Sequence, residues 1–254
     1  MADVLVLAYH AVSEDWPADL SVTPRRLERQ LGELVRRGYR GATFHDAVHA
    51  PAGPRTVAVT FDDAYRSILE LALPIMQRLG VPGTVFVPTD FTGGLLQWPG
   101  IDHWIGSPHE HELSAMTVAQ LQALIDAGWE IGSHTCSHPH LTQLTDAELG
   151  AELVQSRRRC EEMLARPCPT IAYPYGDHDD RVVAATDAAG YTAACTLPER
   201  FSRPTPLRYP RIGVYHEDDG ARFRAKVSPL SRRLRSSAVW PPAARALRGI
   251  RPQR

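Results

Sequence analysis

Strand-like and helix-like segments alternate along most of this chain of 254 residues. The β-branched run 57–61 precedes helical spacing over about 66–79, and a further strand is expected at 84–87. Later strands are expected at 171–173, 191–196 and 212–214. Repeated β-then-α segments predict parallel strands covered by helices. We therefore expect an α/β fold, a distorted (β/α) barrel of about seven parallel strands.

Helix starts are marked by threonines that are typical N-caps. Thr23-Pro24 precedes Leu27, Leu31 and Leu34 at helical spacing, and Gly38 ends that segment. Thr117 and Thr145 introduce further helices in the same way. The segment 89–115 is rich in Gly, Pro, Trp and His, and its length favours a functional loop over a simple connection.

Two short motifs follow predicted strands and carry most of the chemistry. One is Thr60-Phe61-Asp62-Asp63, and the other runs from Ser133 through His134 to His138. The carboxyl ends of parallel barrel strands share one rim, where active sites collect. The sequence therefore predicts two carboxylates and two imidazoles at one end of the barrel.

These residue types fit a mononuclear metal hydrolase. Side chains of consecutive residues in an extended chain point to opposite faces, so Asp63 can bind a metal while Asp62 handles a proton. Three protein ligands leave metal positions open for water and substrate. Taken singly, an Asp-Asp pair is more often a turn signal, and a His-x3-His pair is more often a surface feature. Their joint occurrence after strands favours the metal site.

The two motifs resemble those of the polysaccharide deacetylases of carbohydrate esterase family 4, the NodB-homology family. Residues 60–63 resemble its first motif, and 134–138 resemble its second. Residues 172–176 resemble the third motif, with Ala172 where the family usually has Arg. The resemblance covers about residues 4–215 and implies a NodB-type barrel. It also implies Asp62 as catalytic base and Asp63, His134 and His138 as metal ligands.

Departures from the family pattern leave other roles open. Arg211 is a candidate replacement for the missing Arg, expected to contact Asp62, although a solvated Arg at a strand start is the simpler interpretation. His216 is a candidate general acid, and the alternative is a surface His. His10 closes the first strand, within a Tyr-His pair similar to that of poly-N-acetylglucosamine deacetylases. With Tyr173, Pro174 and Tyr175, His10 forms the expected substrate-binding set.

The resemblance implies a metal-dependent carbohydrate N-deacetylase that releases acetate from an N-acetylated amino sugar or glycan. The metal is expected to be zinc, with cobalt or nickel as alternatives, and the backbone N–H of Tyr175 is a candidate donor to the oxyanion. Two rival hypotheses are a catalytically inactive carbohydrate-binding member and a hydrolase of a non-sugar amide. The sequence does not choose the acetylated substrate or the general acid.

Charge divides the chain into a predicted catalytic barrel, 1–221, and a basic tail, 222–254. The tail has ten basic and no acidic residues, which leaves 18 basic and 29 acidic residues before it. A basic segment containing Trp240 is typical of contact with an anionic membrane surface, which would hold the barrel rim near a lipid-linked sugar. A solvated tail, or one folded onto the acidic body, is the alternative.

Composition indicates an ordinary globular protein. The hydrophobic fraction is 43%, the longest apolar runs are too short to span a bilayer, and the four cysteines form no CxxC pair. We therefore expect a cytoplasmic enzyme, peripheral to the inner membrane if the tail binds lipid, with no nucleic-acid partner.

Overall fold

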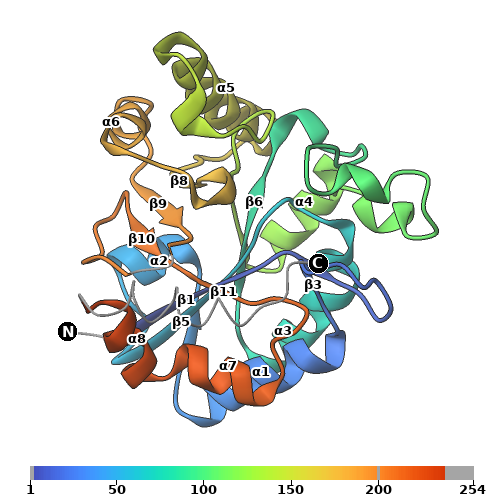
Figure 1. The fold of residues 1–254 in the computed structure, drawn as a ribbon, viewed down its shortest axis with the longest axis vertical. Helices are drawn as coiled ribbons and strands as arrows, with labels where there is room; N and C mark the ends of the chain where they lie inside the picture. The colour runs from blue at the N-terminus through green and yellow to red at the C-terminus, as the bar shows by residue number, and fades with distance from the viewer. Residues whose placement is uncertain (1–2, 199–200, 238–254) are drawn as a thin grey trace, which may run out of the picture.

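The computed structural model describes residues 3–198 and 201–237, and its centre is a parallel sheet curved into a nearly closed barrel (Figure 1). Eight strands follow the order β10-β9-β8-β7-β6-β5-β1-β11, and β4 pairs with β5 beside this path. The strands are β1 (Asp3–Tyr9), β4 (Arg40–Ala42), β5 (Arg55–Phe61), β6 (Gly83–Val87), β7 (Glu130–Ser133), β8 (Thr170–Ala172), β9 (Ala193–Thr196), β10 (Tyr209–Pro210) and β11 (Ile212–Gly213). The predicted α/β barrel is confirmed.

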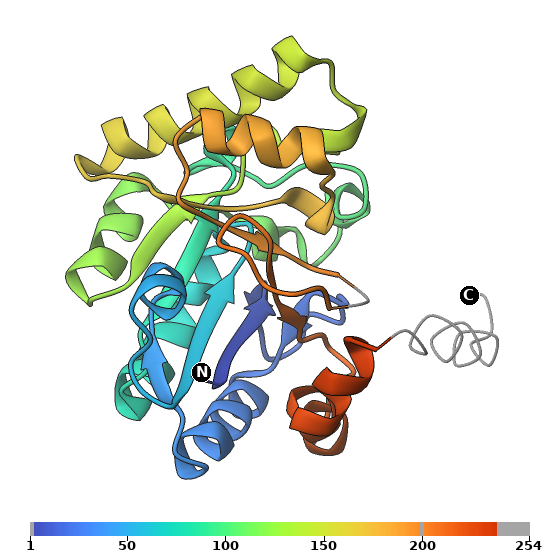
Figure 2. The same cartoon turned by 90° about the vertical axis from the view of Figure 1, so that its left-hand side faces the viewer.

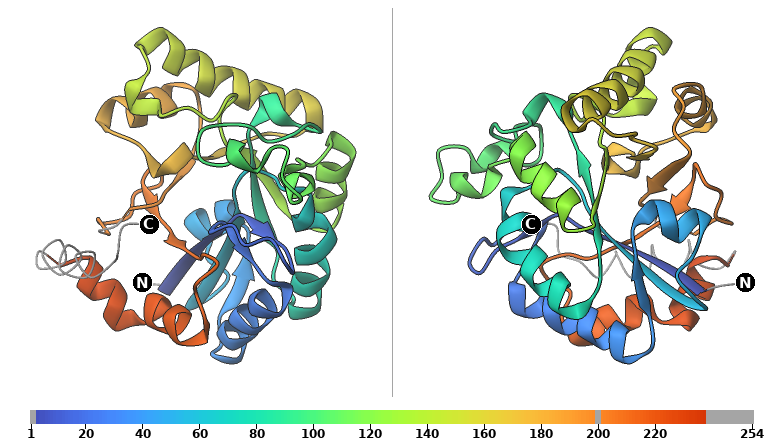
Figure 3. Two further views of the ribbon diagram at one scale, coloured as in Figure 1. Left: turned by 45° about the vertical axis from the view of Figure 1, so that its right-hand side comes forward. Right: turned by 180° about the vertical axis from the view of Figure 1, so that it is seen from behind.

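Helices cover the outer surface of this sheet, as the turned views show (Figures 2 and 3). They are α1 (Pro24–Arg36), α2 (Phe44–His49), α3 (Leu73–Leu79), α4 (Val118–Asp126), α5 (Asp146–Leu164), α6 (Asp180–Ala188), α7 (Gly220–Val227) and α8 (Pro229–Arg235). A π-helical turn, Ile68–Ala72, precedes α3, and β2 (Ala11–Val12) pairs with β3 (Ser21–Val22) in a separate small sheet.

The expected helix starts are present. Thr23 caps α1 by accepting a hydrogen bond from the Arg26 N–H. Thr117 and Thr145 each form a capping box with the Gln or Glu three residues later, which satisfies backbone donors in the first turn. These local signals place the helices that come after β3, the long loop and the His motif.

The barrel interior is filled mainly by small apolar side chains and Phe86. Val6, Ala58, Ala172 and Cys195 belong to one buried cluster with Phe86. Phe44 of α2 packs edge-on against Phe86 and Tyr209 and joins the same cluster. Sequence reasoning did not predict β4 or α2, because both are too short to show a clear hydrophobic period.

The barrel remains open between its two edge strands. β10 and β11 are consecutive in the chain, yet β10 pairs with β9 while β11 pairs with β1. Arg211 is the one residue between them, and it is buried. Its backbone N–H donates to the Thr196 carbonyl, so the chain crosses the gap with Arg211 directed inward.

The first part of the predicted tail is folded onto the body. The expected division after residue 221 falls inside α7, where Phe223 and Val227 are buried. Arg222, Arg224, Lys226 and Arg232 form ion pairs with Glu217, Glu33, Asp218 and Asp3, respectively. Residues 238–254, with Trp240, lie outside the described residues, so a separate tail stays a prediction for them.

Among the described residues, no helix has the length and apolar character needed to cross a membrane. The predicted cytoplasmic location stays a prediction.

Candidate metal centre

The Asp pair lies directly after β5 in an unusual backbone conformation. The Asp62 N–H still donates to the Tyr9 carbonyl, which continues the pairing with β1. Asp63 and Ala64 then have φ values of 70° and 56°, in the left-handed region that costs non-glycine residues about 1–3 kcal/mol. This turn comes at the strand end and separates the two carboxylates. Asp62 contacts Arg211, whereas Asp63 contacts the two histidines.

The two histidines follow β7 in a loop that is held by its own hydroxyl groups. Ser133 Oγ accepts from the Thr135 N–H at 3.1 Å, and Thr135 Oγ1 accepts from the His138 N–H at 3.2 Å. Thr135 and His138 also have positive φ values, 68° and 61°. The ring of Trp98 stacks on His138 with a centroid distance of 4.2 Å. The imidazoles are therefore positioned by both backbone and packing.

Asp63, His134 and His138 come together as one buried group. Asp63 Oδ1 lies 3.5 Å from His134 Nε2 and 3.6 Å from His138 Nε2. One ligand atom from each of the three residues lies within 4.8 Å of the others. The three residues that the sequence predicted as ligands are thus adjacent, and their role as ligands stays a prediction.

The donor set fits a divalent cation. Asp63 Oδ1 is buried and accepts no hydrogen bond within the described part of the chain. Burial, and then the charge of Asp62, raise the pKa of Asp63 well above its ordinary value, so an ionised Asp63 needs a compensating positive charge. Burial lowers the pKa of His134, and burial together with His134 lowers that of His138. Neutral imidazoles are the form that binds metals.

A hydrogen bond fixes the orientation of His134. Its Nδ1 lies 2.7 Å from the Ala172 carbonyl oxygen, so Nδ1 carries the proton and donates it. The Nε2 lone pair then faces Asp63. A backbone partner of this kind is usual for metal-binding histidines.

Asp62 forms a bidentate ion pair with Arg211. The sequence predicted that these two residues are in contact. Arg211 Nη1 donates to Oδ1 at 2.6 Å, and Nη2 donates to Oδ2 at 2.8 Å. Nη1 also donates to Thr60 Oγ1 at 3.0 Å. Burial would raise the pKa of Asp62, but the charge and hydrogen bonds of Arg211 outweigh burial and hold it well below its ordinary range. Asp62 is therefore a carboxylate at neutral pH.

These groups line a cavity of about 360 Å³ at the carboxyl end of the strands. Beyond the Asp and His residues already named, its walls are formed by His10, Leu20, Trp98, Pro99, Gly100, Ile101, Tyr175, Gly176, Leu197 and Tyr215. A pocket of this size accommodates a small ligand.

Two of the expected substrate-binding residues line this cavity. His10 Nε2 lies 3.9 Å from Asp62 Oδ2, and burial lowers the pKa of His10 to about 4 despite that carboxylate. Tyr175 has a left-handed backbone, with φ 59° and ψ 2°. Its ring stacks on His140 with a centroid distance of 4.0 Å and packs edge-on against His138. Both residues are thus within reach of a bound ligand.

Three other predicted residues lie outside the cavity wall. Tyr173 is buried, and its hydroxyl donates to the Leu207 carbonyl. Pro174 is also buried. His216 comes after β11, but its neighbour Tyr215 lines the cavity in its place. The His216 backbone N–H donates to the Asp19 carbonyl. The geometry thus gives no support to His216 as the acid, and that role stays a prediction.

Sequence reasoning missed Trp98, Leu197 and Tyr215. Trp98 belongs to the long loop that was expected to be functional, but nothing local shows that it stacks on His138. Leu197 and Tyr215 come just after β9 and β11. Their position after parallel strands was an available signal, since those ends form the same rim as the Asp and His motifs.

Comparison with known proteins identifies the family. Residues 49–194 match the profile of the family described as polysaccharide deacetylase, which is more than half of the chain. The chain belongs to the polysaccharide deacetylase family. His10 and Arg211 lie outside the matched segment, at the two ends of the barrel sequence.

Two sequence relatives illustrate the range of this family. YxkH of Bacillus subtilis, named after the family, is 26% identical over 234 residues, which cover 90% of this chain and 72% of the relative. The poly-β-1,6-N-acetyl-D-glucosamine N-deacetylase of Staphylococcus aureus is 27% identical over 169 residues. That match covers 62% of this chain and 54% of the relative, so this chain spans about half the length of the Staphylococcus aureus protein.

Two solved structures illustrate the shared fold. The Streptococcus pyogenes deacetylase PplD, in complex with acetate, has a TM-score of 0.75 at 22% identity and covers 90% of this chain and 99% of its own. IcaB from Ammonifex degensii has a TM-score of 0.72 at 22% identity, covering 91% and 98%, respectively. At these identities the likeness supports the barrel architecture.

Proposed function

We propose that this polysaccharide deacetylase family member is a metal-dependent N-deacetylase of an acetamido sugar or glycan. The observation that carries the proposal is the pairing of two neighbouring carboxylates with opposite surroundings. Asp63 is buried beside two neutral imidazoles, and Asp62 is held ionised by Arg211. The first arrangement suits a cation, and the second suits a base in the same cavity.

Asp63, His134 and His138 would hold the divalent ion, and zinc is the first candidate for this donor set. When bound, the ion would polarise the amide carbonyl and make water more acidic. Ile101 and Trp98 close one side of the cavity and would limit access of bulk water.

Asp62 would accept the proton of the attacking water. Its carboxylate is ionised and lies in the cavity wall. Each carboxylate oxygen accepts one hydrogen bond from Arg211, so one lone pair on each oxygen is left for other partners. The attack forms the new C–O bond, the C–N bond breaks, and the amine must receive a proton. Acetate and a free amino sugar result.

Tyr175 and His10 would bind the substrate. The left-handed turn at Tyr175 supports the use of its backbone N–H as a donor to the developing oxyanion. His10 is neutral in the free protein, because burial lowers its pKa to about 4, and it would exchange hydrogen bonds with the sugar. The Staphylococcus aureus relative is named for poly-β-1,6-N-acetyl-D-glucosamine, which supports an acetamido sugar as the substrate class.

The decisive measurement is acetate release by the metal-loaded protein from N-acetylglucosamine oligomers with β-1,4 and β-1,6 links. We expect release from at least one oligomer and loss of activity with a chelator. Asp62→Asn should keep the bound metal and lose kcat by about 10²-fold or more, the usual scale for a positioned proton-transfer group.

The rival hypotheses give different results. A binding-only member would bind the oligomers without releasing acetate, and a hydrolase of a non-sugar amide would neither bind nor cleave them. Full activity of Asp62→Asn would remove Asp62 from the role of base.

A further inference from the structure

Helix α8 exposes two leucines on one face. Leu230 and Leu234 are 69% and 45% exposed. They are four residues apart, so they lie on the same side of the helix. The other exposed large apolar residues of the described chain are Ile105, Val118, Val154 and Tyr175, and no two of these share a helix. Two large apolar side chains exposed together on one helix face are a candidate contact surface.

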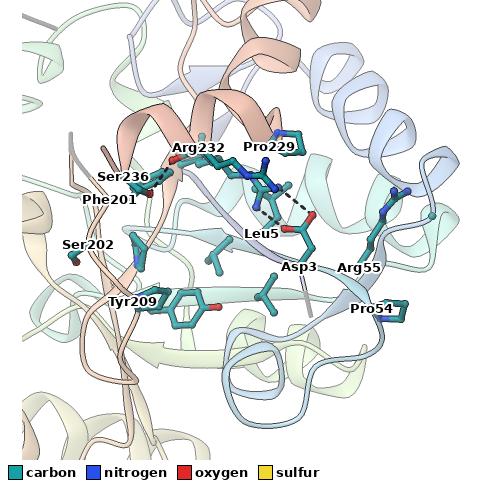
Figure 4. Close-up of a pocket in the computed structure, with 17 residues that line it drawn as sticks. Asp3, Leu5, Pro54, Arg55, Phe201, Ser202, Tyr209, Pro229, Arg232 and Ser236 are labelled. Carbon is teal, nitrogen blue, oxygen red and sulfur yellow. Dashed lines mark hydrogen bonds and ion pairs between the residues drawn. The ribbon is translucent and has the colours of Figure 1, made fainter. Parts of the chain in front are cut away.

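Contacts on the other side of α8 hold this face outward. Arg232 forms a bidentate ion pair with Asp3 at 2.7 and 3.1 Å, as Figure 4 shows. The Arg235 guanidinium lies 4.0 Å from the centroid of the Phe201 ring and donates to the Pro198 carbonyl. The helix is therefore anchored through Arg232 and Arg235, and the leucines are left for another surface.

An exposed arginine lies beside these leucines. Arg233 is exposed and lies three residues after Leu230, on the same face. Arg233 and Arg55 also line a cleft of about 1000 Å³ beside α8 (Figure 4). The chain after Ser237 adds Trp240 and four arginines with no acidic residue. Apolar side chains among arginines, continued by a basic segment with a Trp, are typical of binding at an anionic lipid surface.

We infer that the face of α8 formed by Leu230, Arg233 and Leu234 docks on an anionic lipid bilayer. Charge favours this partner over a second copy of the chain, because two copies meeting through α8 would bring their arginines together. Lipid headgroups supply the opposite charge, and the hydrocarbon boundary accepts the leucines.

The position of α8 sets the orientation of the docked molecule. α8 contacts Asp3 at the start of β1, whereas Tyr9 and His10 lie at the other end of that strand. Seven residues of extended chain separate the two ends by about 20 Å. Docking would therefore leave the catalytic cavity open toward the aqueous side. It would not hold the rim against a lipid-linked sugar, as the sequence alone suggested for a membrane-bound tail.

The test is co-sedimentation of the full chain with vesicles. We expect binding to vesicles of equal parts phosphatidylcholine and phosphatidylglycerol, none to phosphatidylcholine alone, and weaker binding as potassium chloride is added. The double variant Leu230→Gln/Leu234→Gln should lower the partition coefficient at least about tenfold. Arg233→Gln should lower it about fivefold.

A matched control is available on α5. Val154 is 52% exposed, and Arg158 lies four residues later on the same face of that helix. Val154→Gln/Arg158→Gln makes similar changes away from α8 and should bind vesicles like the wild type. Point variants are preferable to truncation at residue 222, which would remove Phe223 and Val227 from the core.

Two outcomes would overturn the inference. In the first, the wild-type protein stays in the supernatant with anionic vesicles at low salt. In the second, the leucine double variant binds these vesicles as tightly as the wild type does. Sedimentation velocity without lipid tests the remaining alternative, which is self-association. If the wild type is a dimer, the leucine double variant is a monomer and the wild type does not bind vesicles, α8 is a surface for self-association. These measurements record lipid binding, so they are independent of the proposed reaction.

Discussion

At the scale of single residues, Asp62 and Asp63 show how neighbours in sequence acquire different chemistry. Burial raises the pKa of Asp63, whereas the charge and hydrogen bonds of Arg211 more than offset burial at Asp62 and lower its pKa. A carboxylate held ionised suits a base, and a carboxylate that needs a cation suits a metal ligand. The left-handed turn at Asp63 is what directs the two side chains apart.

His138→Ala is expected to lower zinc affinity at least about 100-fold, because it removes one of the three proposed ligands and leaves the other two too few to hold the ion. Isothermal titration with zinc measures this. His140→Ala is the control, since His140 is nearby and stacks on Tyr175 without belonging to the ligand group. Unchanged zinc affinity in His138→Ala would mean that the ligand set is wrong.

Arg211→Met is expected to destabilise the protein by about 3–5 kcal/mol, because it leaves the Asp62 carboxylate buried and unpaired. The double variant Arg211→Met/Asp62→Asn removes that charge and should recover part of the loss. Urea unfolding of the metal-free proteins gives both values. If Arg211→Met is as stable as the wild type, the ion pair is not the interaction that keeps Asp62 ionised.

At the scale of elements, the site depends on how closely β6, β7 and β8 pack. Gly132 lies in β7, and a Cβ added there would lie 2.6 Å from Phe86 Cε1 and 2.6 Å from Thr170 Oγ1. β7 leads directly into His134, whose ring donates to the carbonyl of Ala172 at the end of β8. Displacement of β7 would therefore move the His motif relative to Asp63.

Gly132→Ala is expected to cost about 1–3 kcal/mol of stability through overpacking and to weaken zinc binding. The control is Gly150→Ala in α5, where a Cβ would meet nothing within 4 Å. That change should stabilise the protein by about 0.5–1 kcal/mol, because alanine favours a helix interior. Thermal and urea unfolding compare the two. Equal effects of the two substitutions would contradict the packing argument.

At the scale of the whole molecule, α7 and α8 link the end of the described chain to its beginning. β10 and β11 leave the sheet open at one side, and α8 reaches across to β1 through Arg232 and Asp3. The Arg232 hydrogen bonds lower the pKa of Asp3 from its ordinary value of 3.8, with burial opposing them. The ionised form of Asp3 is therefore the one that stabilises the fold.

Asp3→Asn is expected to lower the melting temperature at pH 7 by up to about 3 °C, a small effect because the pair is partly exposed. A lowered folded-state pKa gives stability above the unfolded-state value, and this stability is lost as the pH falls through the folded-state pKa. The difference between wild type and variant should thus begin to shrink near pH 3.8 and disappear below the lowered folded-state pKa of Asp3. A difference that persisted there would point to lost packing in place of lost charge.

The sequence by itself determined the parallel barrel and the group formed by Asp63, His134 and His138. Hydrophobic periodicity and threonine caps act over a few residues, and parallel strands bring the residues at their carboxyl ends to one rim. The sequence predicted that Arg211 contacts Asp62 but left a solvated Arg211 open, and the tertiary structure decided between them: Arg211 enters the barrel through the gap between β10 and β11 and pairs with Asp62, 149 residues away in the chain. It also decided that Trp98 stacks on His138, that Tyr215 lines the cavity where His216 does not, and that α8 turns its leucines outward. Such contacts join segments far apart in sequence. The free energy that selects them comes from packing and charge pairing, which no local pattern records.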